Sequence, residues 1–158
     1  HLRFSRIGVG YDGTPESKTA LEDAAEMARR FNASLELIGV APRVLLTPSR
    51  LGGTDAGYER LLREEMEMRL EAAARVEGVD VGCTLRIGDA ADELADASAD
   101  LDLLVLGSRG YGPLRRVLLG GVSAKVMRAA PCPVMVIPRG SESSGRRGEP
   151  IETSTDTS

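Results

Sequence analysis

The chain has 158 residues, a length typical of one domain. Its 24 acidic and 20 basic residues give a net charge of −4, which argues against a partner that is nucleic acid or an anionic membrane. No apolar run is long enough to cross a bilayer, and the first residues lack the apolar segment of a signal peptide. These features predict a cytoplasmic protein.

Few residues are suited to nucleophilic or metal catalysis. The single histidine is His1, at a chain terminus, which argues against mechanisms that need a histidine base. Cys83 and Cys132 are too few for a zinc site, and we expect both to be buried as small hydrophobic residues. We therefore name no catalytic residue, and the sequence leaves open whether the protein is an enzyme.

The first half of the chain alternates between strand and helix patterns. Apolar alternation predicts a strand over residues 6–12, and apolar residues at three- and four-residue spacing predict a helix over residues 15–31. A second strand is expected over residues 34–40. Residues 42–57 show no clear period and are predicted to form a loop.

The second half continues the alternation. A long helix over residues 56–76 is expected to end before Gly78 and to bury one apolar face, formed by Leu61, Leu62, Met66, Leu70 and Ala73. Strands are then predicted over residues 81–87, 101–106 and 133–137. A short helix over residues 89–94 lies between the first two, and a helix from residue 114 or 121 to residue 129 lies between the last two. The run over residues 101–106 is almost wholly apolar, which predicts a central strand covered on both faces.

This alternation predicts an α/β fold. Parallel neighbours need crossover connections, so we expect an open, doubly wound, five-stranded parallel sheet in the order 3-2-1-4-5 with helices on both faces. Residues 1–138 are assigned to this domain. Residues 139–158 hold one aliphatic residue, Ile151, among polar residues, glycine and proline, and are predicted to form a disordered tail.

Two common nucleotide-binding motifs do not fit their context. Gly8, Gly10 and Gly13 match G-x-G-x-x-G, but the first two fall within the predicted strand. The second strand ends in residues 40–42, which lack the carboxylate that would bind a ribose. No Gly-Lys-Ser or Gly-Lys-Thr occurs, which argues against a Walker P-loop.

A stronger phosphate-binding signal follows the fourth predicted strand. Gly107 and Gly110 are separated by two residues, nine residues follow, and Gly120 and Gly121 then precede Ser123 at a helix start. Glycines let the backbone approach a ligand, and N–H groups at a helix start bind anions. The alternative is that these glycines only turn the chain.

Asp12 is expected to face these glycines. Ligands of open α/β sheets bind at the carboxyl ends of strands where the strand order reverses, which places Asp12 opposite Gly107 and Gly110. There its carboxylate can accept from a ribose hydroxyl or hold Mg²⁺ beside phosphates. The alternative is an Asx turn or a helix cap.

The chain resembles the nucleotide-binding type of the universal stress protein family over about residues 4–138. That type carries G-x-x-G, nine residues, then Gly followed by Ser or Thr, and Gly107, Gly110 and Gly120 match it. Gly121 departs from it because it lacks the hydroxyl, while Ser123 matches a second hydroxyl position. The resemblance implies an adenine nucleotide alpha hydrolase-like fold that binds ATP or another adenine nucleotide, with Mg²⁺ as the metal.

The resemblance also implies roles for individual residues. Asp12 contacts the nucleoside and the metal, the Val40 backbone reads the adenine edge, and Leu106 flanks the ribose. Arg109 lies where the family varies, and its guanidinium either reaches the polyphosphate or stays solvated. The other implied contacts are Gly10, Tyr11, Gly107, Gly110, Gly120, Gly121, Val122 and Ser123.

The resemblance further implies a homodimer that pairs through residues 133–137 and a nucleotide that alters a dimer or partner-binding state. Two alternatives stay open. One is a slow ATPase or autophosphorylating enzyme, with Asp12 on Mg²⁺ and Ser123 as acceptor. The other is a dimeric scaffold that has lost nucleotide binding. The sequence does not identify a protein partner, the preferred nucleotide or a stress signal.

Overall fold

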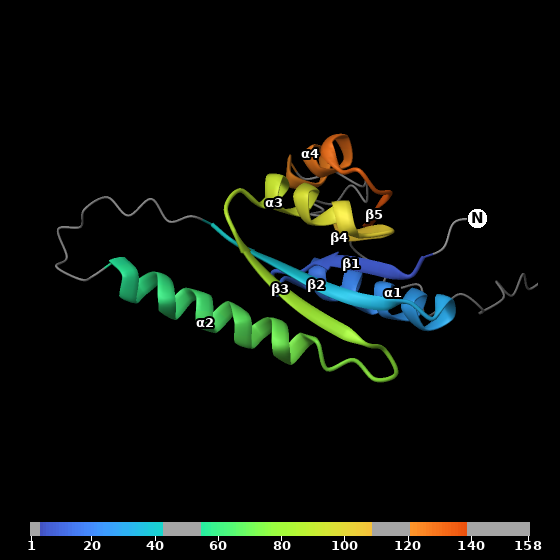
Figure 1. Ribbon diagram of the computed structural model, residues 1–158, viewed down its shortest axis with the longest axis horizontal. Helices are drawn as coiled ribbons and strands as arrows, with labels where there is room; N and C mark the ends of the chain where they lie inside the picture. The colour runs from blue at the N-terminus through green and yellow to red at the C-terminus, as the bar shows by residue number, and fades with distance from the viewer. Residues whose placement is uncertain (1–3, 43–54, 109–120, 139–158) are drawn as a thin grey trace, which may run out of the picture.

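The computed structural model describes residues 4–42, 55–108 and 121–138, and these residues form an α/β fold (Figure 1). Five strands make one parallel sheet in the order β3-β2-β1-β4-β5, which confirms the predicted fold class and strand order. None of the helices within these ranges is long and apolar enough to cross a membrane. The elements are β1 (Arg6–Gly10), α1 (Pro15–Phe31), β2 (Ser34–Ala41), α2 (Asp55–Ala73), β3 (Val81–Ile87), α3 (Ala90–Ala97), a 3₁₀ turn (Ser98–Asp100), β4 (Leu103–Gly107), α4 (Gly121–Ala129) and β5 (Val134–Ile137).

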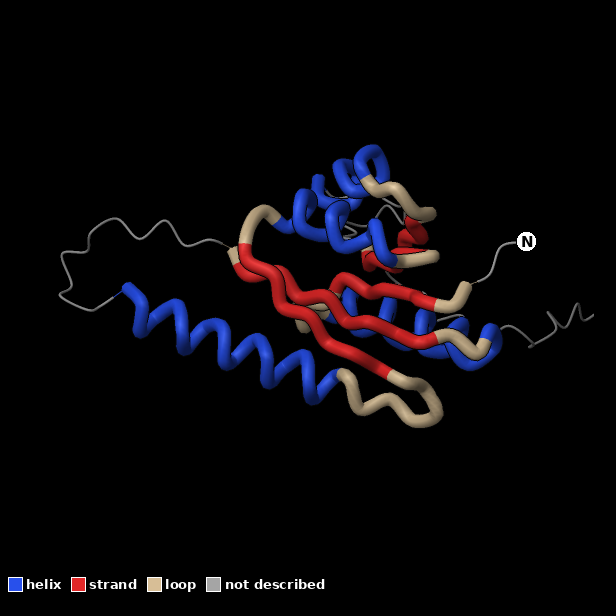
Figure 2. Tube along the Cα trace, viewed as in Figure 1, coloured by secondary structure: helices blue, strands red, loops and turns tan. Residues whose placement is uncertain are grey.

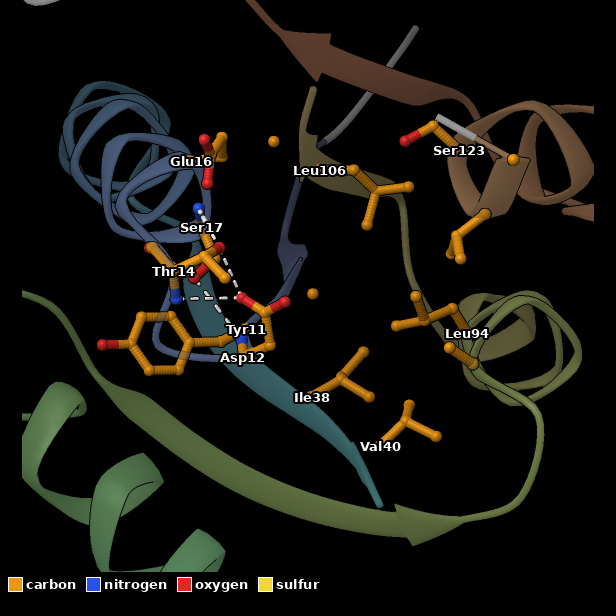
Figure 3. Close-up of a pocket in the computed structure, with 15 residues that line it drawn as sticks. Tyr11, Asp12, Thr14, Glu16, Ser17, Ile38, Val40, Leu94, Leu106 and Ser123 are labelled. Atoms are coloured by element: carbon orange, nitrogen blue, oxygen red, sulfur yellow. Dashed lines mark hydrogen bonds between the residues drawn. The ribbon is translucent and has the colours of Figure 1, made fainter. Parts of the chain in front are cut away.

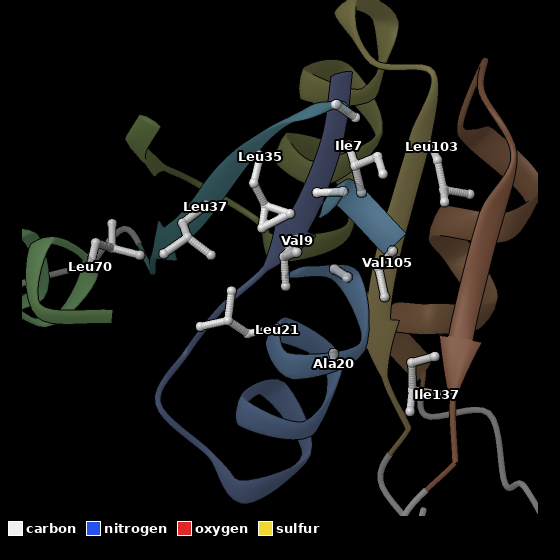
Figure 4. Close-up of a cluster of buried hydrophobic side chains, with 13 residues drawn as sticks. Ile7, Val9, Ala20, Leu21, Leu35, Leu37, Leu70, Leu103, Val105 and Ile137 are labelled. Carbon is white, nitrogen blue, oxygen red and sulfur yellow. The ribbon is translucent and has the colours of Figure 1, made fainter. Parts of the chain in front are cut away.

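Helices cover both faces of the sheet (Figures 1 and 2). Residues that alternate along a strand point to opposite faces, so each strand contributes to two cores. The core under α1 and α2 includes Ile7, Val9, Leu37 and Val105 (Figure 4). The core under α3 and α4 is built from Ile38, Leu94, Leu101, Leu104, Leu106 and Val126 among others.

Helix α1 begins and ends at residues suited to those positions. The Thr14 side chain caps its first turn by accepting from the Ser17 N–H, and Pro15 fits the first helical position. Asn32 ends the helix in the left-handed region, at φ 52°. The cap at Thr14 and Pro15 fixes the start of α1 close to the end of β1, where the site lies.

Asp102 joins the beginnings of β1 and β4. One carboxylate oxygen accepts from the Ser5 N–H (2.9 Å), the Ser5 hydroxyl (2.8 Å) and the Arg6 N–H (2.9 Å). The backbone donor of Arg6, followed by the two Ser5 donors, holds the pKa of this carboxyl below its ordinary value.

We expect Asp102→Asn to lower the urea midpoint of unfolding at neutral pH. Because the folded pKa lies below the unfolded one, the stabilisation is fully present above the unfolded pKa and is lost as pH falls through the folded value. The difference from wild type should therefore shrink below about pH 4. Urea titrations at pH 7 and pH 3 test this, with Asp100→Asn as an exposed control. A difference that is the same at both pH values would contradict it.

Several predicted boundaries differ from the structure. The first strand ends at Gly10 rather than residue 12, because the chain turns there into α1. The predicted loop over residues 42–57 overlaps α2, which begins at Asp55, and the predicted helix stops early, at Ala73. Gly78 lies instead in the turn before β3, at φ +77°. The predicted tail, residues 139–158, lies outside the described residues.

Several residues that were predicted to be buried are exposed or half-buried. Of the predicted apolar face of α2, Leu70 is 3% exposed while Leu61 is 66% exposed. The first turns of α2 extend past the sheet, so they have no strand surface to cover (Figure 1). Cys83 is exposed because β3 is an edge strand, whereas Cys132 is half-buried. The strand that was predicted to be central is β4. It lies between β1 and β5, so it is inside the sheet but one place from its edge.

Candidate functional site

A cavity of about 300 Å³ lies at the carboxyl end of the sheet, between the ends of three strands and the beginnings of three helices (Figure 3). Parallel strands bring their carboxyl ends to one edge, where a ligand crevice forms beside the point at which the strand order reverses. The lining residues are Gly10, Tyr11, Asp12, Thr14, Glu16, Ser17, Ile38, Val40, Ala90, Leu94, Leu106, Gly107, Gly121, Val122 and Ser123.

The structure brings most of the predicted site residues together in this cavity. The predicted residues that line it are Gly10, Tyr11, Asp12, Val40, Leu106, Gly107, Gly121, Val122 and Ser123. They come from the ends of β1, β2 and β4 and from the first turn of α4. Arg109, Gly110 and Gly120 lie outside the described residues.

Other lining residues were not predicted. Thr14, Glu16 and Ser17 belong to the start of α1, and the helix-start pattern after Asp12 was the signal that could have found them. Ile38 lies two positions before Val40 on the same face of β2. Ala90 and Leu94 belong to α3, whose position over the sheet carries no local sequence signal.

Asp12 forms an Asx turn, which was one of the two interpretations of this residue. Its Oδ1 accepts from the Thr14 N–H (3.0 Å) and the Thr14 hydroxyl (2.6 Å). The intervening Gly13 has φ +82°, a value that favours glycine. Asp12 also lines the cavity, and the carboxylate is oriented with one oxygen toward Thr14 and the other toward the open space (Figure 3). The turn thus fixes a carboxylate at the cavity wall.

Gly107 lets the end of β4 approach the start of α1. A Cβ atom on Gly107 would lie 2.5 Å from the backbone oxygen of Glu16 and 2.6 Å from its carbonyl carbon. Backbone atoms cannot rotate away from such a contact. Gly10 is also tightly packed, but there a Cβ would meet a Leu106 methyl group, at 2.6 Å. Glycine at residue 107 therefore sets how closely the two sides of the cavity approach.

The two ends of the cavity differ in polarity (Figure 3). Ile38, Val40 and Leu94 provide apolar side chains between β2 and α3. The opposite end lies between the start of α1 and Ser123 in the first turn of α4. N–H groups and the helix dipole at such positions favour anions. The cavity can therefore hold a ligand with a flat apolar part and an anionic part.

Backbone groups of Val40 face the cavity side of β2. The Ile38 carbonyl accepts from the Tyr11 N–H (2.9 Å) on the β1 side, and the Ala41 carbonyl accepts from the Gly88 N–H (2.9 Å) on the β3 side. Successive residues of a parallel strand point their backbone groups to opposite neighbouring strands. The N–H and C=O of Val40 therefore point to the same side as those of Ile38, toward β1. The chain after Tyr11 turns into α1 there, so the Val40 N–H and C=O border the cavity.

Tyr11 stays neutral at neutral pH. Burial raises the pKa of its hydroxyl, and the nearby Asp12 carboxylate raises it further, against a smaller opposing effect of Arg69. Its ring points away from the apolar end of the cavity (Figure 3). Tyr11 therefore contributes packing at the cavity wall rather than a proton-transfer group at pH 7.

The sequence profile of the universal stress protein family matches residues 3–138. The chain belongs to this family. Universal stress protein Rv1996 of Mycobacterium tuberculosis is 30% identical over 150 residues, which cover 84% of this chain and 47% of that protein. The chain thus spans about half the length of the mycobacterial relatives that it matches.

Solved universal stress protein structures share the fold. A family member from Burkholderia pseudomallei is 29% identical with a TM-score of 0.69, and the match covers 86% of this chain and 97% of that one. A universal stress protein in complex with cAMP is 26% identical with a TM-score of 0.55, over 85% of this chain and 97% of that one.

Among the described residues, no group of three or more His, Cys, Asp or Glu side chains could hold a metal ion. Structural zinc sites, for example, use four such ligands. Mg²⁺ is often held by one or two carboxylates together with substrate phosphates and water. The fixed carboxylate of Asp12 at the cavity wall suits that second kind of site.

Proposed function

We propose that this universal stress protein binds an adenine nucleotide in the cavity, with ATP and Mg²⁺ as the principal ligand, and acts as a cytoplasmic regulatory module. The observation that carries the proposal is the division of one cavity into an apolar end and an end formed by helix starts, with Asp12 on the wall between β1 and α1. The structural neighbour in complex with cAMP supports an adenine nucleotide as the ligand class.

The base would occupy the apolar end. Ile38 and Leu94 offer flat contact to a purine, and the Val40 N–H and C=O provide one donor and one acceptor at its edge. Adenine presents an acceptor, N1, beside an amino donor, N6, which matches this pair. A cavity of about 300 Å³ is at the lower end of the range for small-molecule sites.

The phosphates would occupy the end formed by helix starts. The N–H groups near Gly121 and the hydroxyl of Ser123, which is 6% exposed, are suited to phosphate oxygens. Asp12 would hold Mg²⁺ together with those oxygens, and the ion would neutralise part of the charge of the polyphosphate. Without it, the Asp12 carboxylate would repel the same phosphates.

The outer edge of β5 supports a homodimer. β5 is the last strand of the sheet order, and Met135 on it is 37% exposed. An apolar edge strand pairs readily with a second copy of itself. We propose that the protein is a dimer through this edge and that the bound nucleotide alters the dimer or its contact with a protein partner. A monomer mass in sedimentation at micromolar concentration would contradict the dimer.

Gly121→Ser is expected to tighten ATP binding about 2- to 12-fold. A Cβ at Gly121 meets no atom of the described residues within 4 Å, so serine is accommodated there, and its hydroxyl adds one hydrogen bond worth about 0.5–1.5 kcal/mol. Isothermal titration of both proteins with ATP and Mg²⁺ measures this. Gly121→Ala is the control, because it also replaces glycine with a better helix former but adds no hydroxyl. Absence of binding at millimolar nucleotide in every variant would reject the proposed function.

A further inference from the structure

A second cavity, of about 330 Å³, lies beside the first. It is lined by Val40, Pro42, Gly88, Asp89 and Ala90. Val40 and Ala90 line both cavities, so the second one adjoins the apolar end of the first. A purine at that end would turn its outer edge toward the second cavity, and Asp89 is the charged residue among those that line it.

Asp89 is fixed in place by the start of α3. Its Oδ2 accepts from the Asp92 N–H (3.1 Å), and its backbone oxygen accepts from the Glu93 N–H (2.9 Å). The preceding residue, Gly88, donates to the Ala41 carbonyl (2.9 Å), which ties this turn to the end of β2. The carboxylate therefore has a defined place at the second cavity, which Val40 also lines. When ionised it accepts hydrogen bonds but donates none.

Adenine and the 6-oxo purines present donor and acceptor in opposite order along the edge that would face Val40. Adenine offers N1 as acceptor and the 6-amino group as donor, whereas guanine and hypoxanthine offer N1–H as donor and O6 as acceptor. The Val40 N–H and C=O match the adenine order, and a 6-oxo purine that shifts along them keeps at most one of the two hydrogen bonds. A further group that tolerates only one of the two 6-substituents would add to this selectivity.

We propose that Asp89 is a specificity-determining residue that selects 6-amino purines over 6-oxo purines. This inference rests on the proposed function. The carboxylate accepts a hydrogen bond from a 6-amino group. Because an ionised carboxylate has no proton to donate, it repels the lone pairs of O6 instead. Because Asp89 is solvent-exposed, we expect a preference of about tenfold rather than the much larger factors of buried polar sites.

The test compares ATP with inosine triphosphate, which carries a 6-oxo group and lacks the 2-amino group of guanine. Isothermal titration with Mg²⁺ gives both affinities for the wild type, Asp89→Asn and Asp89→Ser. Asparagine and serine keep the helix cap, so α3 should still form. In the wild type ATP should bind at least about tenfold tighter. In Asp89→Asn the amide can donate to O6, and the ratio should fall about tenfold from its wild-type value; in Asp89→Ser it should also fall.

Asp92→Asn is the matched control. Asp92 lies in the same first turn of α3, is exposed, and lines neither cavity. It removes the same charge, so a general electrostatic effect on nucleotides would appear in both variants. We expect its ATP to inosine triphosphate ratio to equal that of the wild type.

The outcomes separate the two proposals. If the wild type binds neither nucleotide, the proposed function fails and the selectivity fails with it. If the wild type binds ATP, but Asp89→Asn and Asp89→Ser keep the wild-type ratio, the inference about Asp89 is overturned and the proposed function stands. A ratio that falls equally in Asp92→Asn also overturns it, because charge rather than position would then explain the change.

Discussion

Gly107→Ala is expected to weaken ATP binding tenfold or more and to lower the free energy of unfolding by about 1–3 kcal/mol. The new Cβ would lie 2.5 Å from the Glu16 backbone oxygen, so the end of β4 and the start of α1 must separate. That separation moves Asp12, which precedes α1, away from the phosphate end of the cavity. Titration with ATP and Mg²⁺ and urea unfolding at pH 7 measure the two effects.

Gly121→Ala is the matched control for this substitution. It adds the same methyl group to another glycine of the same cavity, where a Cβ meets no atom within 4 Å in the part of the chain that the structure describes. We expect it to unfold at or above the wild-type urea concentration, since alanine is the better helix former. If Gly107→Ala binds and unfolds like the wild type, the close approach of β4 to α1 is not needed for the site.

The fold was predictable because its signals are local. Aliphatic runs in β1, β2 and β4 and the helix patterns between them leave few topologies once crossovers are required to be right-handed. Helix α2 shows the limit of this reasoning. Its apolar spacing predicts a buried face, but Leu61 is exposed because the helix is longer than the sheet surface beneath it. Periodicity defines a face, and only the tertiary arrangement determines how much of that face is covered.

The site residues that lie at the ends of strands were predictable. Asp12 follows β1 and Gly107 is the last residue of β4, and neighbouring parallel strands must bring them to one edge. Leu94, which lines the first cavity, and Asp89, which lines the second, were not predicted as site residues. Their place depends on how α3 crosses from β3 to β4, which is set by packing on Leu104 and Leu106 rather than by any local motif.

Asp12→Asn is expected to weaken ATP binding at least tenfold when Mg²⁺ is present, with little change in stability. Asparagine keeps an oxygen that can accept from the Thr14 N–H and hydroxyl, so the Asx turn persists. The charge that would hold Mg²⁺ is lost. Asp12→Ala removes the acceptor as well and should lower the free energy of unfolding by about 1–2 kcal/mol.

The sign of the Asp12→Asn effect should reverse when the metal is removed. In EDTA the wild-type carboxylate faces the phosphates without a cation between them, so the neutral asparagine should bind ATP as well as the wild type or better. Glu22→Gln, on the exposed side of α1, changes the net charge equally and should leave both affinities unchanged. If EDTA weakens ATP binding by the same factor in wild type and Asp12→Asn, Mg²⁺ is held elsewhere, and Asp12 serves only to fix the turn between β1 and α1.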